Sequence, residues 1–282
     1  MRKIYAFADE ASHIIDEQIT AMKRNGLAGL EIRNVDDVNV SDITLDKAKE
    51  VKKKLDDAGL ITWAIGSPIG KIRFGVDDFS EHLEKFKHTI EIARILGSGN
   101  IRLFSFYPPK GEDAAPYKNE VIDRLGQFVE TAKGSGIDLC HENEKGIYGD
   151  TAARCLELHK AIPDLKAVFD PANFVQCGQD TLEAWEKLHS HVHYMHIKDA
   201  LPNGNVVAPG DGDGNVPARI AKYFAQGGEV LSLEPHLFEF VGLKALEREG
   251  EKSVVGALSF ETAEAAFDHA ADKLKNILEE IV

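Results

Sequence analysis

Short β-rich runs alternate with longer segments of helical periodicity along the whole 282-residue chain, and this alternation constrains the fold most. The predicted strands are 3–8, 28–33, 61–66, 100–106, 137–143, 165–170, 191–197 and 229–234. The predicted helices are 14–25, 44–58, 79–96, 118–133, 151–161, 181–188, 217–226 and 260–281. Eight strand–helix units, each of about 35 residues, predict an α/β protein with one domain over residues 1–282, a (β/α)8 TIM barrel.

A doubly wound sheet is the competing α/β architecture. It usually carries a glycine-rich nucleotide loop after an early strand, whereas the chain reads Asp9-Glu10-Ala11-Ser12 at that point. The barrel is therefore favoured. An extra segment, 235–259, makes the connection between the last strand and the last helix long, and we expect it to be a lid, an interface loop or a small additional helix.

Charge and cysteine content narrow the range of partners. Forty-seven acidic residues against 33 basic ones give a formal net charge of −14 at pH 7, which repels nucleic acid and anionic membrane surfaces. The three cysteines are scattered and favour a reducing, cytoplasmic environment. No apolar run has the length of a signal peptide or of a transmembrane helix. From the charge and the absence of such a run, we expect neither a nucleic acid nor a membrane as partner.

Polar residues end four consecutive predicted strands: Glu142, Asp170, His196 and Glu234. In a barrel the active site lies at the carboxyl ends of the strands, and alternation with apolar neighbours points these side chains inward. Three converging carboxylates would repel one another unless a divalent cation offset their charge. The predicted site is therefore a metal centre. Oxygen ligands with one nitrogen make Mn²⁺ the preferred ion, with Mg²⁺, Co²⁺ and Zn²⁺ as the other candidates.

Several motifs carry a family resemblance over nearly the whole chain. They are GLEIR at 29–33, CHENEKGIYGDT at 140–151, FDPANF at 169–174, YMHIKDA at 194–200, PGDGDG at 209–214 and LEPH at 233–236. The sequence resembles xylose isomerase-like TIM barrels, which include sugar phosphate isomerases/epimerases and ketose 3-epimerases. The resemblance implies the same four metal ligands, a small carbohydrate substrate and a tendency to form homo-oligomers.

The resemblance also implies a mechanism. In the epimerase members the first and last glutamates of the metal site move protons on opposite faces of the sugar, so Glu142 and Glu234 would form the acid–base pair. The metal polarises a carbonyl and stabilises the enediolate that follows removal of the neighbouring proton. Inversion, aldose–ketose isomerisation and β-elimination all begin with this step, and the metal ligands do not distinguish between them.

His141 departs from the ketose epimerase pattern, because those enzymes do not carry a His-Glu-Asn-Glu strand end. It is similar to barrels that eliminate a leaving group from 3-keto glycosides, which gives an alternative function: a lyase or dehydratase with His141 as the base. Strict strand alternation turns His141 toward the helices, however, and a packing role is its other interpretation.

Further residues are candidates for substrate contacts. Lys198 shares the inward face of His196 and is a catalytic candidate for stabilising an oxyanion or binding a hydroxyl. Arg33 and Arg102 also face the lumen, where they would bind substrate or, with Glu31, form a salt-bridged layer. Trp63 would stack on a sugar or pack in the core, and His236 would cover the substrate or lie in a solvated loop.

Two rival functions have other requirements. A DNA-repair endonuclease shares this barrel but needs a basic groove and a histidine-rich zinc cluster, which the charge of −14 opposes. A non-catalytic sugar-binding barrel is the second rival. Asp199, Asp211 and Asp213 follow the strand at 191–197, where barrels often hold phosphate, and their charge argues for a neutral sugar or glycoside. The 209–214 loop lacks the glutamate of a calcium loop and is predicted to be a tight turn.

Overall fold

The computed structural model describes residues 2–239 and 260–281, and its central feature is a closed barrel of parallel strands. The barrel strands are β1 (Lys3–Ala6), β2 (Gly29–Ile32), β5 (Ile61–Gly66), β6 (Asn100–Leu103), β7 (Asp138–Glu142), β8 (Lys166–Phe169), β9 (Val192–Ile197) and β12 (Val230–Leu233). Their order around the barrel is β1-β12-β9-β8-β7-β6-β5-β2. All eight predicted strands are present, and closure of the sheet excludes the doubly wound alternative.

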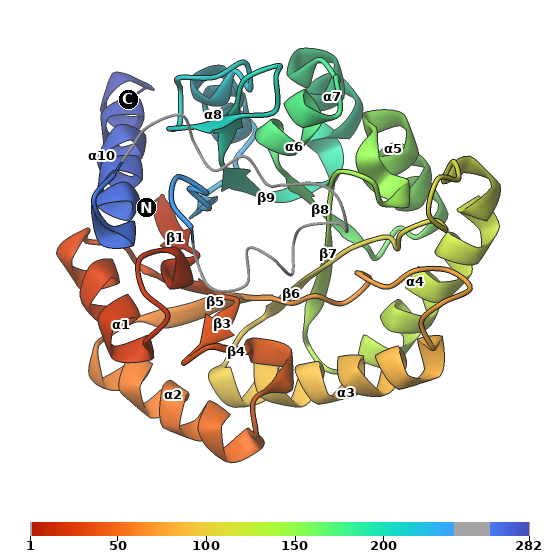
Figure 1. The fold of residues 1–282 in the computed structure, drawn as a ribbon, viewed down its shortest axis with the longest axis horizontal. Helices are drawn as coiled ribbons and strands as arrows, with labels where there is room; N and C mark the ends of the chain where they lie inside the picture. Colours follow the sequence, from red (N-terminus) through yellow and green to blue (C-terminus); the bar gives the residue numbers. More distant parts are fainter. Residues whose placement is uncertain (1, 240–259, 282) are drawn as a thin grey trace.

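Helices surround the barrel as an outer ring (Figure 1). They are α1 (Ile15–Arg24), α2 (Leu45–Asp57), α3 (Phe79–Leu96), α4 (Lys118–Ala132), α5 (Ala152–Ala161), α6 (Pro171–Gln176), α7 (Thr181–Leu188), α8 (Val216–Ala225) and α10 (Ala263–Ile281). The structure confirms the predicted single-layer ring of strands covered by helices, the (β/α)8 barrel. Within the described residues, no helix has the length and apolar character needed to cross a membrane.

Local sequence signals account for the helix ends. The Thr44 hydroxyl accepts a hydrogen bond from the backbone N–H of Lys47 and caps the start of α2. Gly97 ends α3 with φ at 72°, a left-handed conformation that costs glycine little. The ring closes where Arg24 of α1 binds Asp268 of α10 with two hydrogen bonds of 2.9 Å.

Some elements were not predicted. They are the short helix α6 and two hairpins, β3 (Asn34–Val35) with β4 (Val38–Asn39) and β10 (Asp199–Ala200) with β11 (Val206–Val207). These lie in connections that follow barrel strands, where the pattern indicated loops. Of the predicted extra segment 235–259, residues 240–259 lie outside the described part of the chain, so its roles as lid or interface stay predictions.

The glycine-rich loop at 209–214 wraps around a buried side chain. The Asp199 carboxylate accepts hydrogen bonds from the backbone N–H groups of Gly210, Gly212 and Gly214 at 3.0, 3.0 and 2.8 Å, and from that of Ala200 at 2.9 Å. An added Cβ at Gly212 would lie 2.4 Å from Asp199 Oδ1, so this position requires glycine. The loop is a turn whose backbone N–H groups bind the buried carboxylate of Asp199.

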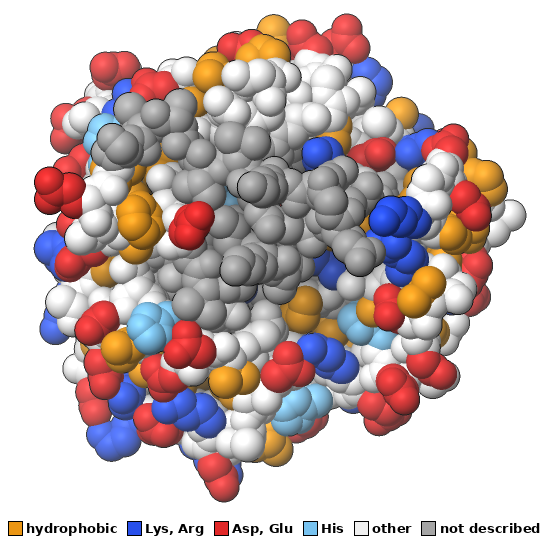
Figure 2. Space-filling model, in the orientation of Figure 1, with side chains coloured by type: hydrophobic (Ala, Val, Ile, Leu, Met, Phe, Trp, Pro, Cys, Tyr) orange, Lys and Arg blue, Asp and Glu red, His pale blue; other side chains and the backbone are white. Residues whose placement is uncertain are grey.

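The barrel interior changes character along its axis. Apolar and aromatic side chains such as Tyr5, Val168 and Tyr194 fill the end from which the strands start, and Trp63 packs against them. Toward the carboxyl ends of the strands, the interior residues are charged. On the face drawn in Figure 2, acidic and basic side chains of the described residues intermingle around the rim. The barrel therefore has an apolar floor and a polar mouth.

Candidate metal centre

Four side chains from four neighbouring strands converge in the mouth. Glu142 ends β7, Asp170 follows β8, His196 lies near the end of β9, and Glu234 follows β12. Each is at most 4% exposed, and one candidate ligand atom from each lies within 4.8 Å of the others. We call this group the carboxylate–histidine cluster. The structure thus brings together all four predicted metal ligands.

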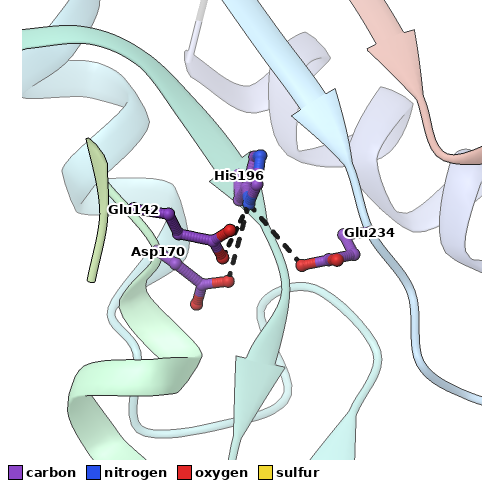
Figure 3. A group of neighbouring side chains, drawn as sticks. All are labelled: Glu142, Asp170, His196 and Glu234. Carbon is purple, nitrogen blue, oxygen red and sulfur yellow. Dashed lines mark hydrogen bonds and ion pairs between the residues drawn. The ribbon is translucent and has the colours of Figure 1, made fainter. Parts of the chain in front are cut away.

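The cluster is arranged around Nδ1 of His196. Glu142 Oε1 lies 3.0 Å from this nitrogen and Asp170 Oδ2 lies 3.9 Å from it. Glu234 Oε2 lies 3.6 Å from the same nitrogen, across the cluster from Glu142 and Asp170 (Figure 3). One imidazole nitrogen and three carboxylate oxygens therefore surround a common point from more than one side.

The turn after β8 fixes the direction of Asp170. Its Oδ1 accepts a 2.9 Å hydrogen bond from the backbone N–H of Asn173 and caps α6, which begins with Pro171. The Asn143 side chain binds both backbone groups of Asp170, each at 2.9 Å. Asn173 also donates from Nδ2 to Glu142 Oε1 at 3.2 Å. The Asp-Pro-Ala-Asn sequence therefore orients two of the cluster's carboxylates.

One buried oxygen of the cluster has an ion pair with a lysine but no hydrogen bond among the described residues. Asp170 Oδ2 accepts no hydrogen bond from the described residues, although Lys198 Nζ lies 3.0 Å away. Burial and the charges of Glu142 and Glu234 raise the pKa of Asp170 to about 6, against the opposing effect of Lys198. A carboxylate oxygen in this state suits a cation. Hard oxygen donors with one imidazole nitrogen fit a divalent metal ion, which Glu142, Asp170, His196 and Glu234 would hold.

Basic side chains stabilise the glutamates from outside the cluster. Lys198 Nζ lies 3.0 Å from Glu234 Oε2, and Arg33 Nη1 lies 3.1 Å from Glu234 Oε1. Arg102 Nε lies 3.4 Å from Glu142 Oε2. Lys198, Arg33 and Arg102 are all buried. These three predicted residues therefore belong to the site, and the two arginines hold carboxylates of the protein itself.

Three other candidates lie elsewhere. The His141 ring points away from the lumen, and its Nε2 lies 3.0 Å from the Ser105 hydroxyl in the layer beneath the helices. Trp63 stacks on Tyr5 in the barrel floor, with ring centroids 5.3 Å apart. His236 lies in the loop after β12, where its Nδ1 is 3.1 Å from Glu10. The structure therefore brings His236 to the edge of the mouth and leaves His141 and Trp63 outside it.

The site contains residues that the sequence pattern did not single out. Asp9 and Glu10 bind Arg33 at 2.8 and 3.0 Å, in a 3-10 turn directly after β1. Asn173 belongs to the helix that the pattern missed. An acidic pair after the first strand and an asparagine three positions after Asp170 are signals that could have indicated both, because strand ends and helix caps gather at the mouth.

Comparison with known proteins identifies the family of this chain. The family model described as "Xylose isomerase-like TIM barrel" matches residues 19–236, which include every member of the cluster. The chain belongs to the xylose isomerase-like TIM barrel family. The family expected from the motifs is thereby confirmed. No curated protein matches the sequence.

Solved structures of xylose isomerase-like barrels share the fold at low sequence identity. The probable 3-DHS dehydratase AsbF of Bacillus anthracis superposes with a TM-score of 0.73 at 17% identity, covering 98% of this chain and 99% of its own. The IOLI protein with a bound zinc atom superposes with a TM-score of 0.73 at 17% sequence identity, covering 100% of this chain and 99% of its own. D-psicose 3-epimerase of Clostridium cellulolyticum with D-tagatose superposes with a TM-score of 0.71 at 14% sequence identity, covering 98% of this chain and 99% of its own.

Proposed function

We propose that this protein is a divalent-metal-dependent isomerase or epimerase of a small carbohydrate, with Glu142 and Glu234 as its acid–base pair. The observation that carries the proposal is that the two glutamates approach His196 Nδ1 from different directions, at 3.0 and 3.6 Å, and face each other across the cluster (Figure 3). A substrate carbon between them would meet one carboxylate on each face. Mn²⁺ is the proposed ion, and the zinc in the similar IOLI structure supports a metal at such a site.

The chain's own residues would divide the chemistry. A bound metal ion would polarise the substrate carbonyl and make the adjacent C–H acidic. One glutamate would accept that proton, and the other would return a proton to the opposite face or to the neighbouring carbon. Lys198, 3.0 Å from Glu234, would bind a substrate hydroxyl. Arg102 and Arg33 would hold the carboxylates of Glu142 and Glu234 in place.

The position of Lys198 favours a second candidate, elimination. An ammonium group 3.0 Å from both Asp170 and Glu234 is placed to protonate a departing oxygen, and AsbF, the probable dehydratase, has the same fold. His141 is not the base in this version, since its ring lies beneath the helices with Ser105. Glu142 or Glu234 would remove the proton in both reactions.

The charge of the mouth supports a neutral substrate. Among the residues that the structure describes, its buried carboxylates outnumber its buried cationic side chains by six to three. The carboxylates are Asp9, Glu10, Glu31, Glu142, Asp170 and Glu234, and the cations are Arg33, Arg102 and Lys198. One divalent ion leaves this balance slightly negative. A sugar phosphate would add like charge to a buried site, so we propose a free sugar or glycoside.

Solvent exchange in deuterium oxide tests the proposal. The Mn²⁺-loaded protein is incubated with a panel of free ketoses and 3-keto glycosides and followed by NMR. Isomerisation or epimerisation puts deuterium on a substrate carbon and leaves the substrate in one piece, whereas elimination releases an aglycone. Exchange that persists undiminished after complete removal of metal with a chelator would refute the metal-dependent mechanism.

A further inference from the structure

We infer that Glu31 is a positioning residue for the metal centre: it fixes the orientation and the tautomer of His196. This inference rests on the proposed metal site. It adds a residue on β2 that contacts none of the three carboxylate ligands and would not touch the substrate. Its action on the metal would pass mainly through the imidazole ring, which it contacts directly, while Arg102 lies between Glu31 and Glu142 at 3.8 and 3.4 Å.

The two ring nitrogens of His196 face different groups. Nδ1 faces Glu142, Asp170 and Glu234. Nε2, on the far side of the ring, lies 3.0 Å from Glu31 Oε2. A neutral imidazole offers a lone pair on one nitrogen and carries a proton on the other. If Glu31 accepts the proton of Nε2, the lone pair of Nδ1 is directed at the cluster, as metal binding requires.

Glu31 is itself held as an acceptor. The side chain is 0% exposed, and its Oε1 accepts a 2.8 Å hydrogen bond from the Tyr194 hydroxyl. Arg102 Nε lies 3.8 Å from the same oxygen. Both neighbours direct N–H or O–H groups at this carboxyl group, so it is placed as an acceptor. An ionised carboxylate accepts hydrogen bonds and donates none, so it selects the Nε2–H form of His196.

Two aromatic rings pack against the His196 imidazole. The Phe7 and His196 rings meet edge to face with centroids 5.2 Å apart, and Tyr194 meets the same ring at 5.6 Å. β2 and β9 are not neighbours in the barrel, so the Glu31–His196 contact spans the lumen. A carboxylate that accepts a hydrogen bond from a metal-binding imidazole raises the basicity of the imidazole and its affinity for the metal.

The tautomer can be measured in the unmodified protein. We would label histidine with ¹⁵N, titrate with Zn²⁺ and assign His196 from the spectrum of His196→Gln. The expected result is a zinc-induced shift of Nδ1 with the proton retained on Nε2. Zinc on Nε2, or a proton on Nδ1, overturns the inference while leaving the metal site intact. Absence of zinc binding overturns both this inference and the proposed function.

A variant separates positioning from general support of the fold. In Glu31→Gln the shape is kept and the charge is lost, so affinities for Zn²⁺ and Mn²⁺ by calorimetry should fall on the order of 10–100-fold. Tyr194→Phe is the matched control, because it removes the other hydrogen bond to Glu31 and keeps the Glu31–His196 contact. Equal metal affinity in Glu31→Gln and in the wild type overturns the inference. The wild-type spectrum decides the question if Glu31→Gln does not fold.

Discussion

Arg33 and Glu234 are joined by a contact of 3.1 Å between Nη1 and Oε1, although 201 positions separate them in the sequence. The same guanidinium binds Asp9 at 2.8 Å and Glu10 at 3.0 Å. All four side chains are buried. The position of one candidate metal ligand therefore depends on a network of buried charges shared by β1, β2 and β12.

Replacing Arg33 should destabilise the fold strongly. Arg33→Met leaves three buried carboxylates without their common cation, and such a loss lowers the free energy of unfolding by about 3–5 kcal/mol. Urea denaturation measures it. Arg24→Met is the matched control, since Arg24 also binds two carboxylates but is solvent-exposed and should cost about 1 kcal/mol or less. Equal losses in the two variants would contradict a special role for Arg33.

Neutralising Glu234 should abolish most turnover. Glu234→Gln keeps the size of the side chain but can neither accept a proton nor ligate metal as an anion, so turnover should fall at least about 100-fold. The readout is the rate of deuterium incorporation into the substrate carbon. Glu229→Gln, at the opposite end of the same strand region and exposed, should keep wild-type rates. Full activity in Glu234→Gln would remove Glu234 from the mechanism.

The excess of buried carboxylates predicts a preference for uncharged ligands. Calorimetry on the Mn²⁺-loaded protein compares a free ketose with its phosphate, and the phosphate should bind about tenfold more weakly or worse. Raising the ionic strength should change little, because buried charges are poorly screened. Tighter binding of the phosphate would show that the charge balance of the mouth does not select the substrate.

Acidification should destabilise the protein through His82. Burial lowers the pKa of His82 from 6.5 to about 4, and its Nε2 accepts a 2.8 Å hydrogen bond from the backbone N–H of Gly70. The unfolded chain takes up the proton first, so this contribution to stability is complete above pH 6.5 and is lost as the pH falls toward 4.

The comparison variant for this effect is His82→Gln, whose amide oxygen can accept the same hydrogen bond without titrating. Below pH 6.5, the free energy of unfolding should fall less steeply in the variant, by up to about 1.4 kcal/mol per pH unit. Urea denaturation at pH 7, 6 and 5 provides the slopes. Parallel slopes would mean that His82 is readily protonated in the folded state.

The loop around Asp199 should depend on that single side chain. Asp199→Ala leaves several backbone N–H groups without an acceptor, at about 1–3 kcal/mol for each buried group, so we expect a loss of at least about 3 kcal/mol in unfolding free energy. Asp213→Ala, exposed in the same loop, should change it by about 0.5 kcal/mol or less. Similar losses in both variants would refute the interpretation that the Asp199 carboxylate holds the loop together.

The periodicity of the sequence predicted the barrel because each strand is a short apolar run followed by a segment of helical periodicity. Alternation also indicated that the four candidate side chains point inward, since a strand's inward face is settled by its apolar outward neighbours, as in Leu231 and Leu233 beside Glu234, and in the structure the four lie together. The role of each candidate ligand stays a prediction. What alternation supplied was the common direction of four side chains.

The remaining features depend on contacts between distant parts of the chain. Arg33 was a candidate for binding substrate, and in the structure its donors are engaged by Asp9, Glu10 and Glu234. Trp63 is an extra residue of β5 with no partner in β2, and the register between the two strands shifts there, between Leu30 and Glu31. Neither the partners of a charged side chain nor such a shift is encoded in local periodicity.

Asp170 serves two structures with its two oxygens, since Oδ1 caps α6 and Oδ2 faces the cluster. The orientation of this candidate ligand is consequently coupled to the formation of the first turn of that helix. The backbone amide of Asn173 is thus a built-in reporter: its exchange with solvent deuterium would slow when an ion occupies the site. A spectroscopist could follow occupancy from within the helix, without a substrate and without a label on the ion.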